Sequence, residues 1–528
     1  MIESTKSSLQ EDLAKLRRSP QAMASWQNAL TQLNSGLHAP ALAGYRNLVQ
    51  QFPNVPQLWA ELGLAAAEEL EFALADQSFQ RALELAPSDA VLLAFIGTQY
   101  YQLRRLDQAF SCFKRAVVAD PSSTGARRDL ASWLERSRRL DEAWKYVESC
   151  VAQHPKDAHM LYFQAFLLRR KGLDREAETA LRSLLQNDSL LPLDVQFNAN
   201  FLLGNVLDAL GQYAEALTCL GKAKMLRRKM GDTAQLEQDY EKMALARRKL
   251  LAELTPETLR RWRDEAADSP CPHRLALLGG AARSGTTLME QILGVHPDIL
   301  VFDETLSFGK EVVSRLHPPL SAREMTLESL NDLTAAGRAQ MIGRYFKSLL
   351  RETEEKPGDR LLLDKNPSRT VWLHIWLRLF PQSKVVMALR DPRDVIISCY
   401  FQNFPLNWSI IGFLSFEGTA KYYSGCMDAW LRMRELGGFE WIETRYEDVV
   451  GNLEAEGRRV TNFLGLPWHE AQATYYETAG RQFVHSPTYN EVGKPIYKRS
   501  MGRWEHYAEA MAPLQPGLAK YLRAFGYG

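Results

Sequence analysis

The sequence predicts two successive parts, an α-helical solenoid and then an α/β domain with a largely parallel sheet. The first prediction rests on a 34-residue period marked by Pro53, Pro87, Pro121 and Pro155, because stacked helical hairpins repeat at such intervals. The second rests on short apolar runs that alternate with amphipathic stretches in the C-terminal half, as strands and helices do in a parallel sheet. A chain of 528 residues can bury more than one core.

The composition excludes several classes of protein. Lys and Arg number 64 and Asp and Glu number 63, so the net charge of +1 gives no overall attraction for nucleic acid. The 6 cysteines form neither a CxxC pair nor a disulfide framework, which is typical of a reducing compartment. The polar N-terminal segment lacks a signal-peptide pattern, and no stretch of about 18 apolar residues indicates a membrane span. We therefore expect a cytoplasmic protein without a metal centre.

The repeat columns pair a small residue with a larger one. The small residues are Ala41, Ala75, Ala109, Ala143 and Ala177, and the larger ones, four positions later, are Tyr45, Phe79, Phe113, Val147 and Leu181. A small residue lets paired helices approach, and a large one fills the groove between them. This pattern resembles the tetratricopeptide repeat, in about six copies from residue 21 to about residue 230. The resemblance implies a concave face that binds a peptide or partner protein, although such arrays also act as spacers or oligomerisation surfaces.

The segment between the two parts predicts connecting helices. It is charged with helical apolar spacing, and Thr255 can cap a helix that begins at Pro256. Asp268-Ser269-Pro270 then ends helicity. We therefore divide the chain into a repeat solenoid, connecting helices and an α/β domain, at residues 1–230, 231–272 and 273–528.

The α/β domain opens with a strand, a glycine turn and the start of a helix. The apolar run 275–278 meets Gly279-Gly280, and an apolar helical pattern follows Arg283, Ser284, Gly285, Thr286 and Thr287. Backbone N–H groups and the helix dipole of such a turn bind phosphate. The spacing Gly280-x4-Gly285 is P-loop-like, but Thr286 stands where that motif requires lysine. The loop therefore indicates a phosphate site with a task other than nucleoside triphosphate hydrolysis.

Polar residues also follow the later predicted strands. They are Asp303-Glu304 after 298–302, Lys365 after 361–363, Arg390 after 384–389 and Tyr446 after 441–444. Ligands of parallel sheets bind outside the carboxyl ends of the strands. We therefore expect these side chains to gather at one edge of the sheet.

Two motifs together resemble the sulfotransferases that use 3′-phosphoadenosine-5′-phosphosulfate (PAPS). They are Arg283-Ser-Gly-Thr-Thr after the first strand, and Arg390-Asp-Pro-Arg-Asp with Ser398 after a later strand. The spacing RSGTTLMEQIL…HPD…DET is most similar to the protein-tyrosine sulfotransferase branch. The resemblance covers roughly residues 275–507. It implies PAPS as the sulfuryl donor and no metal ion.

The resemblance assigns donor-binding roles to individual residues. The loop Arg283-Ser284-Gly285-Thr286-Thr287 would hold the 5′-phosphosulfate, and Arg390 with Ser398 would hold the 3′-phosphate, because arginine offers a planar fork to phosphate. Further donor contacts would come from Tyr446, Thr488 and Lys494. Tyr446 could instead pack against the sheet, and the basic segment 494–503 could instead be a solvated loop.

The resemblance also assigns catalytic roles to three residues. Arg283 would face the charge on the leaving phosphate, and Lys365 would stabilise the transferring group. Glu304 would be the general base that takes the proton of the acceptor hydroxyl. Asp303 beside it is the alternative base. Cytosolic small-molecule sulfotransferases place a histidine base two residues after the lysine, where this chain has Pro367, so the glutamate is favoured.

We therefore predict an enzyme that transfers the sulfuryl group of PAPS to an acceptor hydroxyl. The favoured acceptor is a protein or peptide tyrosine, with the repeats binding a substrate or a partner protein. One alternative is a carbohydrate, a lipid or a small phenol as acceptor. Another is a repeat scaffold that binds a nucleotide without catalysis; the full set of Arg283, Glu304, Lys365, Arg390 and Ser398 argues against it.

Overall fold

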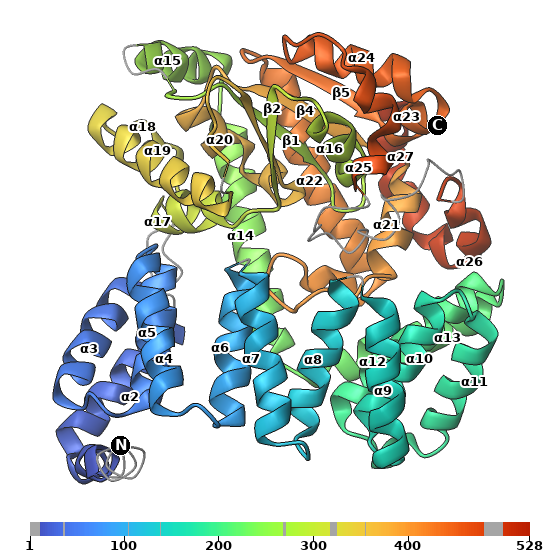
Figure 1. Cartoon of the computed structure of the whole chain (residues 1–528). Helices are drawn as coiled ribbons and strands as arrows, with labels where there is room; N and C mark the ends of the chain where they lie inside the picture. The colour runs from blue at the N-terminus through green and yellow to red at the C-terminus, as the bar shows by residue number, and fades with distance from the viewer. Residues whose placement is uncertain are drawn as a thin grey trace. The chain divides into compact units, whose positions relative to one another are not determined.

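Residues 11–528 are described by the computed structural model, except 35–36, 104, 138, 268–270, 317–324, 354 and 480–499. Contacts between residues divide the chain into two units, Met1–Leu184 and Leu185–Gly528. Figure 1 draws both with their helices and strands labelled.

Helices that pack in consecutive pairs build the first unit. Their bounds are α2 Pro20–Asn34, α3 His38–Gln51, α4 Pro56–Glu68, α5 Phe72–Leu85, α6 Ala90–Gln102, α7 Leu106–Ala119, α8 Thr124–Arg136, α9 Leu140–Gln153, α10 Ala158–Arg170 and α11 Asp174–Leu185. The predicted repeat solenoid is confirmed. The four prolines of the 34-residue period each stand two residues after the end of a helix, α3, α5, α7 or α9.

The packing of each pair explains the small and large columns. A Cβ atom on Gly63 would lie only 2.5 Å from the ring of Phe79, and one on Gly97 only 2.9 Å from the ring of Phe113. Phe79 and Phe113 are themselves buried. The large side chain of one helix therefore occupies the space that glycine leaves on its neighbour, and a larger residue at either glycine would push the pair apart.

A five-stranded parallel sheet forms the centre of the second unit. Its spatial order is β2-β3-β1-β4-β5. The strands are β1 Leu275–Gly280, β2 Ile299–Asp303, β3 Leu361–Lys365, β4 Lys384–Leu389 and β5 Trp441–Arg445, and all adjacent pairs are parallel. After β1 the chain forms β2 and β3 on one side of β1, and it then forms β4 and β5 on the other side. A ligand crevice is expected beside the carboxyl end of β1, where the strand order reverses.

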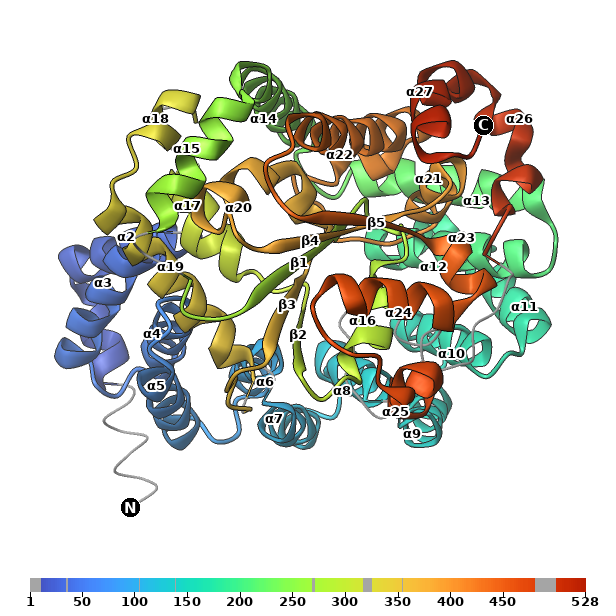
Figure 2. The same cartoon turned by 90° about the horizontal axis from the view of Figure 1, so that it is seen from above.

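Both faces of the sheet are covered. Leu275 and Leu277 of β1 join one apolar cluster, whereas the alternate residues Ala276 and Leu278 join another. Figure 2 shows α14 and α22 on one side of the sheet and α16 and α24 on the other. Side chains of successive strand residues point to opposite faces, so these strands are apolar throughout rather than alternating. This explains the continuous apolar runs in the sequence.

The helices of the second unit surround this sheet. They are α12 Leu193–Ala209, α13 Tyr213–Arg228, α14 Thr233–Glu253, α15 Pro256–Ala267, α16 Thr286–Gly294, α17 Ser314–Leu316, α18 Leu327–Asn331, α19 Ala335–Leu349, α20 Leu373–Leu379, α21 Pro392–Tyr400, α22 Phe416–Leu436, α23 Tyr446–Gly451, α24 Leu453–Phe463, α25 Tyr475–Ala479, α26 Ala508–Met511 and α27 Gln515–Phe525. Within the described ranges, no helix combines the length and apolar character needed to cross a bilayer.

The last helical pair with the repeat pattern, α12–α13, belongs by its contacts to the second unit, although the sequence groups it with the solenoid. Lys224 of α13 donates to the carbonyl of Gln402 at 3.2 Å. Arg503 forms an ion pair of 2.8 Å with Asp208 of α12. The contacts therefore divide the chain before this pair, at Leu184/Leu185.

Candidate active site

The loop predicted to bind phosphate lies between β1 and α16. Gly280 has φ 154° and Gly285, the N-cap of α16, has φ 95°. A Cβ atom on Gly280 would lie 2.7 Å from the carbonyl oxygen of Ala388, and one on Gly285 would lie 2.8 Å from the ring of Tyr446. Both positions therefore require glycine for backbone conformation and for space.

The hydroxyl residues of the loop are buried. Ser284, Thr286 and Thr287 all lie in the interior. The Ser284 hydroxyl donates to the carbonyl of Ala281 at 2.8 Å. The first turn of α16 carries the two threonines, so the N–H groups of this turn and the positive end of the helix dipole lie at the loop. This is the arrangement that binds an anionic oxygen.

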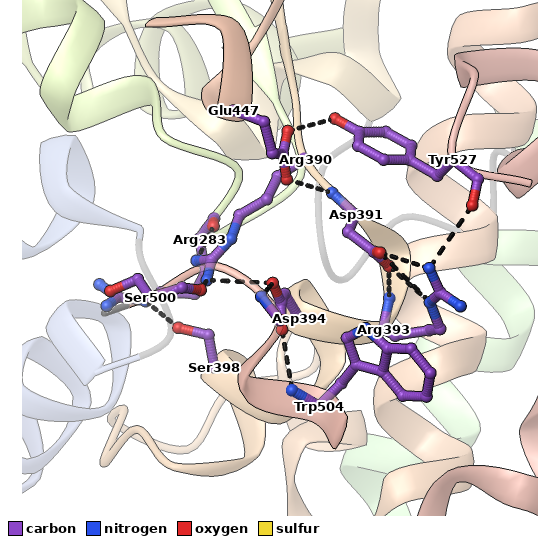
Figure 3. A network of polar contacts seen from close by, with 11 residues as sticks. Arg283, Arg390, Asp391, Arg393, Asp394, Ser398, Glu447, Ser500, Trp504 and Tyr527 are labelled. Atoms are coloured by element: carbon purple, nitrogen blue, oxygen red, sulfur yellow. Dashed lines mark hydrogen bonds and ion pairs between the residues drawn. The ribbon is translucent and has the colours of Figure 1, made fainter. Parts of the chain in front are cut away.

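Arg283, Arg390 and Ser398 meet beside this loop, although the sequence separates them widely (Figure 3). Nε of Arg283 donates to the hydroxyl of Ser398 at 2.9 Å, and Nη1 of Arg390 donates to the carbonyl of Arg283 at 3.2 Å. Arg283 has φ 68°, a left-handed conformation that is strained for a residue with a side chain. Two guanidinium groups therefore lie at one end of the loop.

Arg390 is buried between an aromatic ring and the chain near Ser500. Its Cζ lies 4.8 Å from the centre of the Tyr446 ring. Nη2 donates to the carbonyl of Ser500, and the carboxylate of Asp394 is 3.9 Å away. The buried Nε has no hydrogen-bond partner among the described residues. The guanidinium thus retains one unused donor.

Asp394, the last residue of the Arg390-Asp-Pro-Arg-Asp motif, fixes the segment that follows residue 499. Its carboxylate accepts from the backbone N–H groups of Gly502 at 2.8 Å and Trp504 at 2.9 Å. Burial raises the pKa of Asp394, while Arg390 opposes that rise. Its spacing of four residues from Arg390 on the start of α21 was the available signal.

Arg393 and Asp391 form a separate pair on the far side of α21. Asp391 is the N-cap of this helix and accepts from the backbone N–H of Arg393 at 2.9 Å. The two side chains form an ion pair of 2.6 Å, and Arg393 stacks over Trp504 at 4.0 Å. The side chain of Arg393 therefore stabilises the start of α21 and does not contact the loop.

Lys365 lies at the centre of three carboxylates. Its Nζ is 2.5 Å from Oδ1 of Asp303, 3.0 Å from Oε1 of Glu304 and 3.1 Å from Oε2 of Glu290. Asp303 stands opposite Lys365 in the β2–β3 pairing, and the N–H of Glu304 donates to the carbonyl of Lys365 at 2.8 Å. The strand register therefore brings Lys365 to both acidic residues, as the sequence predicts, and α16 adds the third.

The three carboxylates differ in their access to solvent. The side chain of Glu304 is 37% exposed, against 13% for Asp303 and 4% for Glu290, while that of Lys365 is fully buried. Glu304 also has φ 49°, a second strained position in the site. Of the three carboxylates, that of Glu304 is therefore the most accessible to a group that approaches from solvent.

Burial and charge act in opposite directions within this cluster. Burial alone would lower the pKa of Lys365, but the three carboxylates outweigh it and raise that pKa above its ordinary value. Burial raises the pKa of Glu290 to about 8 even though Lys365 lowers it. Lys365 is thus firmly cationic, and Glu290 is the carboxyl most easily protonated.

The residue after Glu304 is held from two directions. The carbonyl of Thr305 accepts from Nδ2 of Asn366 at 3.1 Å and from Nη2 of Arg369 at 3.0 Å. Arg369 in turn pairs with the buried Asp364 at 3.0 Å. These contacts fix the backbone that carries Glu304.

The remaining predicted donor contacts differ in outcome. Tyr446 lies against Gly285 and under Arg390, so its ring packs on the loop itself. Thr488 and Lys494 lie outside the described residues, as do most residues of the basic segment 494–503. Arg503 pairs with Asp208 instead of pointing to the loop.

Glu290 is the site residue that the sequence analysis missed. It is an acidic residue among the apolar residues of 288–293 in α16. Such a pattern places the carboxylate at a buried position, where acids are rare, and this was the signal available in the sequence. Its contact with Lys365 links the helix after the phosphate loop to the neighbouring strand β3.

Comparison with known proteins gives matches to both parts of the chain. A model described as the sulfotransferase family matches residues 276–470, a range that contains every described member of the predicted site. Models of the tetratricopeptide repeat match residues 96–158 and 197–230.

Individual relatives are distant in sequence. An uncharacterized protein of Aquifex aeolicus is 26% identical over 429 residues, which cover 78% of this chain and 53% of that protein. Protein-tyrosine sulfotransferase A of Caenorhabditis elegans is 27% identical over 266 residues, 47% of this chain and 66% of that protein. Protein-tyrosine sulfotransferase 2 of Gallus gallus is 26% identical over 269 residues, 47% of this chain and 68% of that protein. The chain therefore spans about half of the Aquifex protein and about two thirds of the other two.

Proposed function

Since the chain joins tetratricopeptide repeats to a sulfotransferase-family domain, we propose that it transfers a sulfuryl group from PAPS to an acceptor hydroxyl. The observation that carries the proposal is the pair of cationic regions beside one phosphate loop. One holds Arg283 and Arg390, and the other holds Lys365 next to an exposed carboxylate, Glu304.

The residues at the loop fit a donor with phosphate groups at both of its ends. Residues 283–287 would hold the 5′-phosphosulfate through backbone N–H groups and the two threonines. Arg390 and Ser398 would hold the 3′-phosphate. The buried Nε of Arg390, which lacks a partner among the described residues, supplies a donor for an anionic oxygen. A P-loop lysine is unnecessary because PAPS has no γ-phosphoryl group. PAPS supplies the activated sulfuryl group that the reaction transfers.

Glu304 acts as the general base in this proposal. Its carboxylate accepts the proton of the acceptor hydroxyl as the hydroxyl oxygen attacks sulfur. The bond between sulfur and the phosphate oxygen breaks, and the negative charge moves to the departing phosphate. Arg283 and Lys365 offer positive charge to the groups on which that charge develops.

Asp303 and Glu290 position Lys365 rather than react. The ammonium is held by both carboxylates, at 2.5 and 3.1 Å, so it keeps its place when Glu304 becomes protonated. A buried cation without these partners would be strongly destabilising. Glu290 therefore supports the site from the helix α16.

The favoured acceptor is a tyrosine of a protein or peptide. The names of the Caenorhabditis and Gallus relatives support this choice, and a repeat solenoid offers a surface for the polypeptide that carries the tyrosine. A carbohydrate, lipid or small phenol as acceptor is the alternative within the same chemistry.

Two measurements test the proposal. Calorimetry should detect tight binding of 3′,5′-adenosine bisphosphate and weak binding of ATP; the reverse preference would exclude PAPS as the donor. Incubation with [35S]PAPS and a panel of tyrosine peptides, glycans and phenols should label peptides first. Labelling of glycans or phenols alone would change the acceptor, and bisphosphate binding without any labelling would favour a nucleotide-binding scaffold.

A further inference from the structure

A cavity of about 490 Å³ lies between α14 and α22 in the second unit. These helices lie side by side on one face of the sheet (Figure 2). The lining residues are Tyr240, Ala244, Arg247, Arg248, Leu251, Ala252, Lys421, Ser424, Gly425, Asp428, Ala429 and Arg432. None of them belongs to the site at the carboxyl ends of the strands, and the volume is in the range of small-molecule sites.

Arg247 is a buried cation at the wall of this cavity. Only 7% of the residue is exposed, and no described residue forms a hydrogen bond or an ion pair with its guanidinium. Arginine stays charged in proteins, and a buried charge is stable only with a counter-charge and hydrogen bonds. The nitrogens of Arg247 are not among the fully enclosed polar atoms, so the guanidinium faces the cavity with its donors available.

The other charged groups around the cavity are engaged or open to solvent. Lys421 pairs with Glu241, and Arg432 pairs with Glu435 at 3.0 Å. The cavity's one acidic lining residue, Asp428, pairs with Lys520 at 2.6 Å. These pairs do not use the guanidinium of Arg247.

Two further basic contacts shape the rim of the cavity. Arg432 also donates to the backbone carbonyls of Leu251 at 3.2 Å and Leu254 at 2.8 Å. Arg248 is an exposed arginine at the rim. The lining thus carries four basic residues against the single acid Asp428, so the cavity favours a negative ligand.

Apart from Tyr240 and Ser424, the remaining lining has no polar side chain, and the cavity leaves room for more than an inorganic ion. Ala244, Leu251 and Ala429 contribute side chains without polar atoms. A Cβ atom on Gly425 would lie 3.0 Å from Nη2 of Arg247 and 3.4 Å from the hydroxyl of Tyr240. Glycine at this position therefore preserves the space around the guanidinium.

We propose that this cavity binds an organic anion whose carboxylate, sulfate or sulfonate head meets Arg247 and whose apolar body fills the space toward Leu251. Arg247 is the counter-charge of the head group, and the planar guanidinium offers two parallel N–H donors to it. Binding here does not depend on the transfer reaction.

Calorimetry on the full chain tests this site with four probes. Naphthalene-2-sulfonate and 2-naphthoate combine an anionic head group with an apolar body. Inorganic sulfate has the anionic group alone, and 2-naphthol has the apolar body without the anion. We expect one or both naphthalene anions to bind at least roughly tenfold more tightly than sulfate and 2-naphthol, because charged hydrogen bonds and apolar burial both contribute. Equal binding of sulfate or of 2-naphthol would overturn the proposal.

Three variants assign the binding to Arg247. Arg247→Met should weaken binding of the preferred probe by roughly tenfold or more. Lys249 is an exposed neighbour outside the cavity, so Lys249→Met should leave that binding unchanged. Arg247→Met should also keep or raise the melting temperature of the unliganded chain, since it removes an uncompensated charge; a structural arginine would lower it. Ala252→Trp alters an exposed lining residue and should block entry of the probe into the cavity without disturbing the core. This variant therefore tests the site even where Arg247→Met fails to fold. Unchanged binding in a folded Arg247→Met or in Ala252→Trp would overturn the site.

Discussion

The region around Arg390, the arginine region, and the region around Lys365, the lysine region, surround their cations in opposite ways. Arg390 contacts two backbone carbonyls and a tyrosine ring and keeps an unused donor at Nε. Lys365 instead lies within 3.1 Å of three carboxylates. The arginine region therefore has positive charge in excess, whereas the lysine region is negative as a whole when all three acids are ionised.

This difference separates binding from chemistry. A region with free donors and excess positive charge gains most from an incoming phosphate. A lysine that is already neutralised gains less from binding an anion, but it is fixed in place beside a carboxylate that can take a proton. We infer that the arginine region determines donor affinity and the lysine region determines the rate of transfer.

The largest expected effect follows from removing the base. Glu304→Gln should lower kcat by roughly 10²- to 10⁴-fold while the affinity for 3′,5′-adenosine bisphosphate stays the same, because Arg390 and the loop are untouched. The rate of [35S] transfer and calorimetry on the same preparation measure both. Asp303→Asn is the matched variant: if it removes turnover while Glu304→Gln does not, Asp303 is the base.

The next effect comes from the cation at the centre of the cluster. Lys365→Met should lower kcat by roughly 10²- to 10³-fold and destabilise the fold by roughly 3–5 kcal/mol near pH 8, since three carboxylates then lack their partner. The destabilisation should shrink toward pH 5 as Glu290, whose pKa burial raises, becomes protonated. Urea denaturation at both pH values measures it. Lys384→Met, at the start of β4, which β1 separates from β3, is the control, and an equal pH dependence in both variants would contradict the account.

The sequence could predict those parts of the site whose positions depend on a single contiguous motif or on the ends of strands. The loop 283–287 is a contiguous stretch whose glycines require a particular backbone. Glu304, Lys365 and Arg390 each follow a strand, and parallel strands bring their carboxyl ends to one edge. No knowledge of side-chain packing is needed for either inference.

The parts that sequence could not predict depend on contacts across elements. Glu290 reaches Lys365 only because α16 packs beside β3, and Asp394 binds Gly502 only because the chain returns to α21 after a long excursion. The helical pair α12–α13 has the repeat pattern yet packs on the second unit. Repeat spacing reports how helices pair, not which neighbours they join.

A smaller effect should distinguish the arginine region from the lysine region. Arg390→Met should weaken the binding of 3′,5′-adenosine bisphosphate by roughly tenfold to a hundredfold, which is the range for loss of a charged hydrogen-bond network. It should change the binding of ATP little. Arg393→Met, whose partner is Asp391, is the control for the loss of an arginine three residues further along the chain. Calorimetry with both nucleotides measures the ratio. A similar loss of ATP binding in Arg390→Met would show that this arginine does not select the 3′-phosphate.

The smallest effect concerns the proton on Glu290. Its pKa is raised from 4.5 to about 8 by burial. Between these values the folded chain holds a proton that the unfolded chain has released, so the stabilisation present below pH 4.5 is lost as the pH rises toward 8. Glu290→Gln cannot lose that proton. From pH 5 to pH 8 its melting temperature should therefore fall less than that of the original chain. Glu454→Gln, an exposed acid paired with Arg458, should follow the original chain. Parallel melting curves for all three proteins would mean that Lys365 keeps Glu290 ionised, and the cluster would then hold three charges at neutral pH.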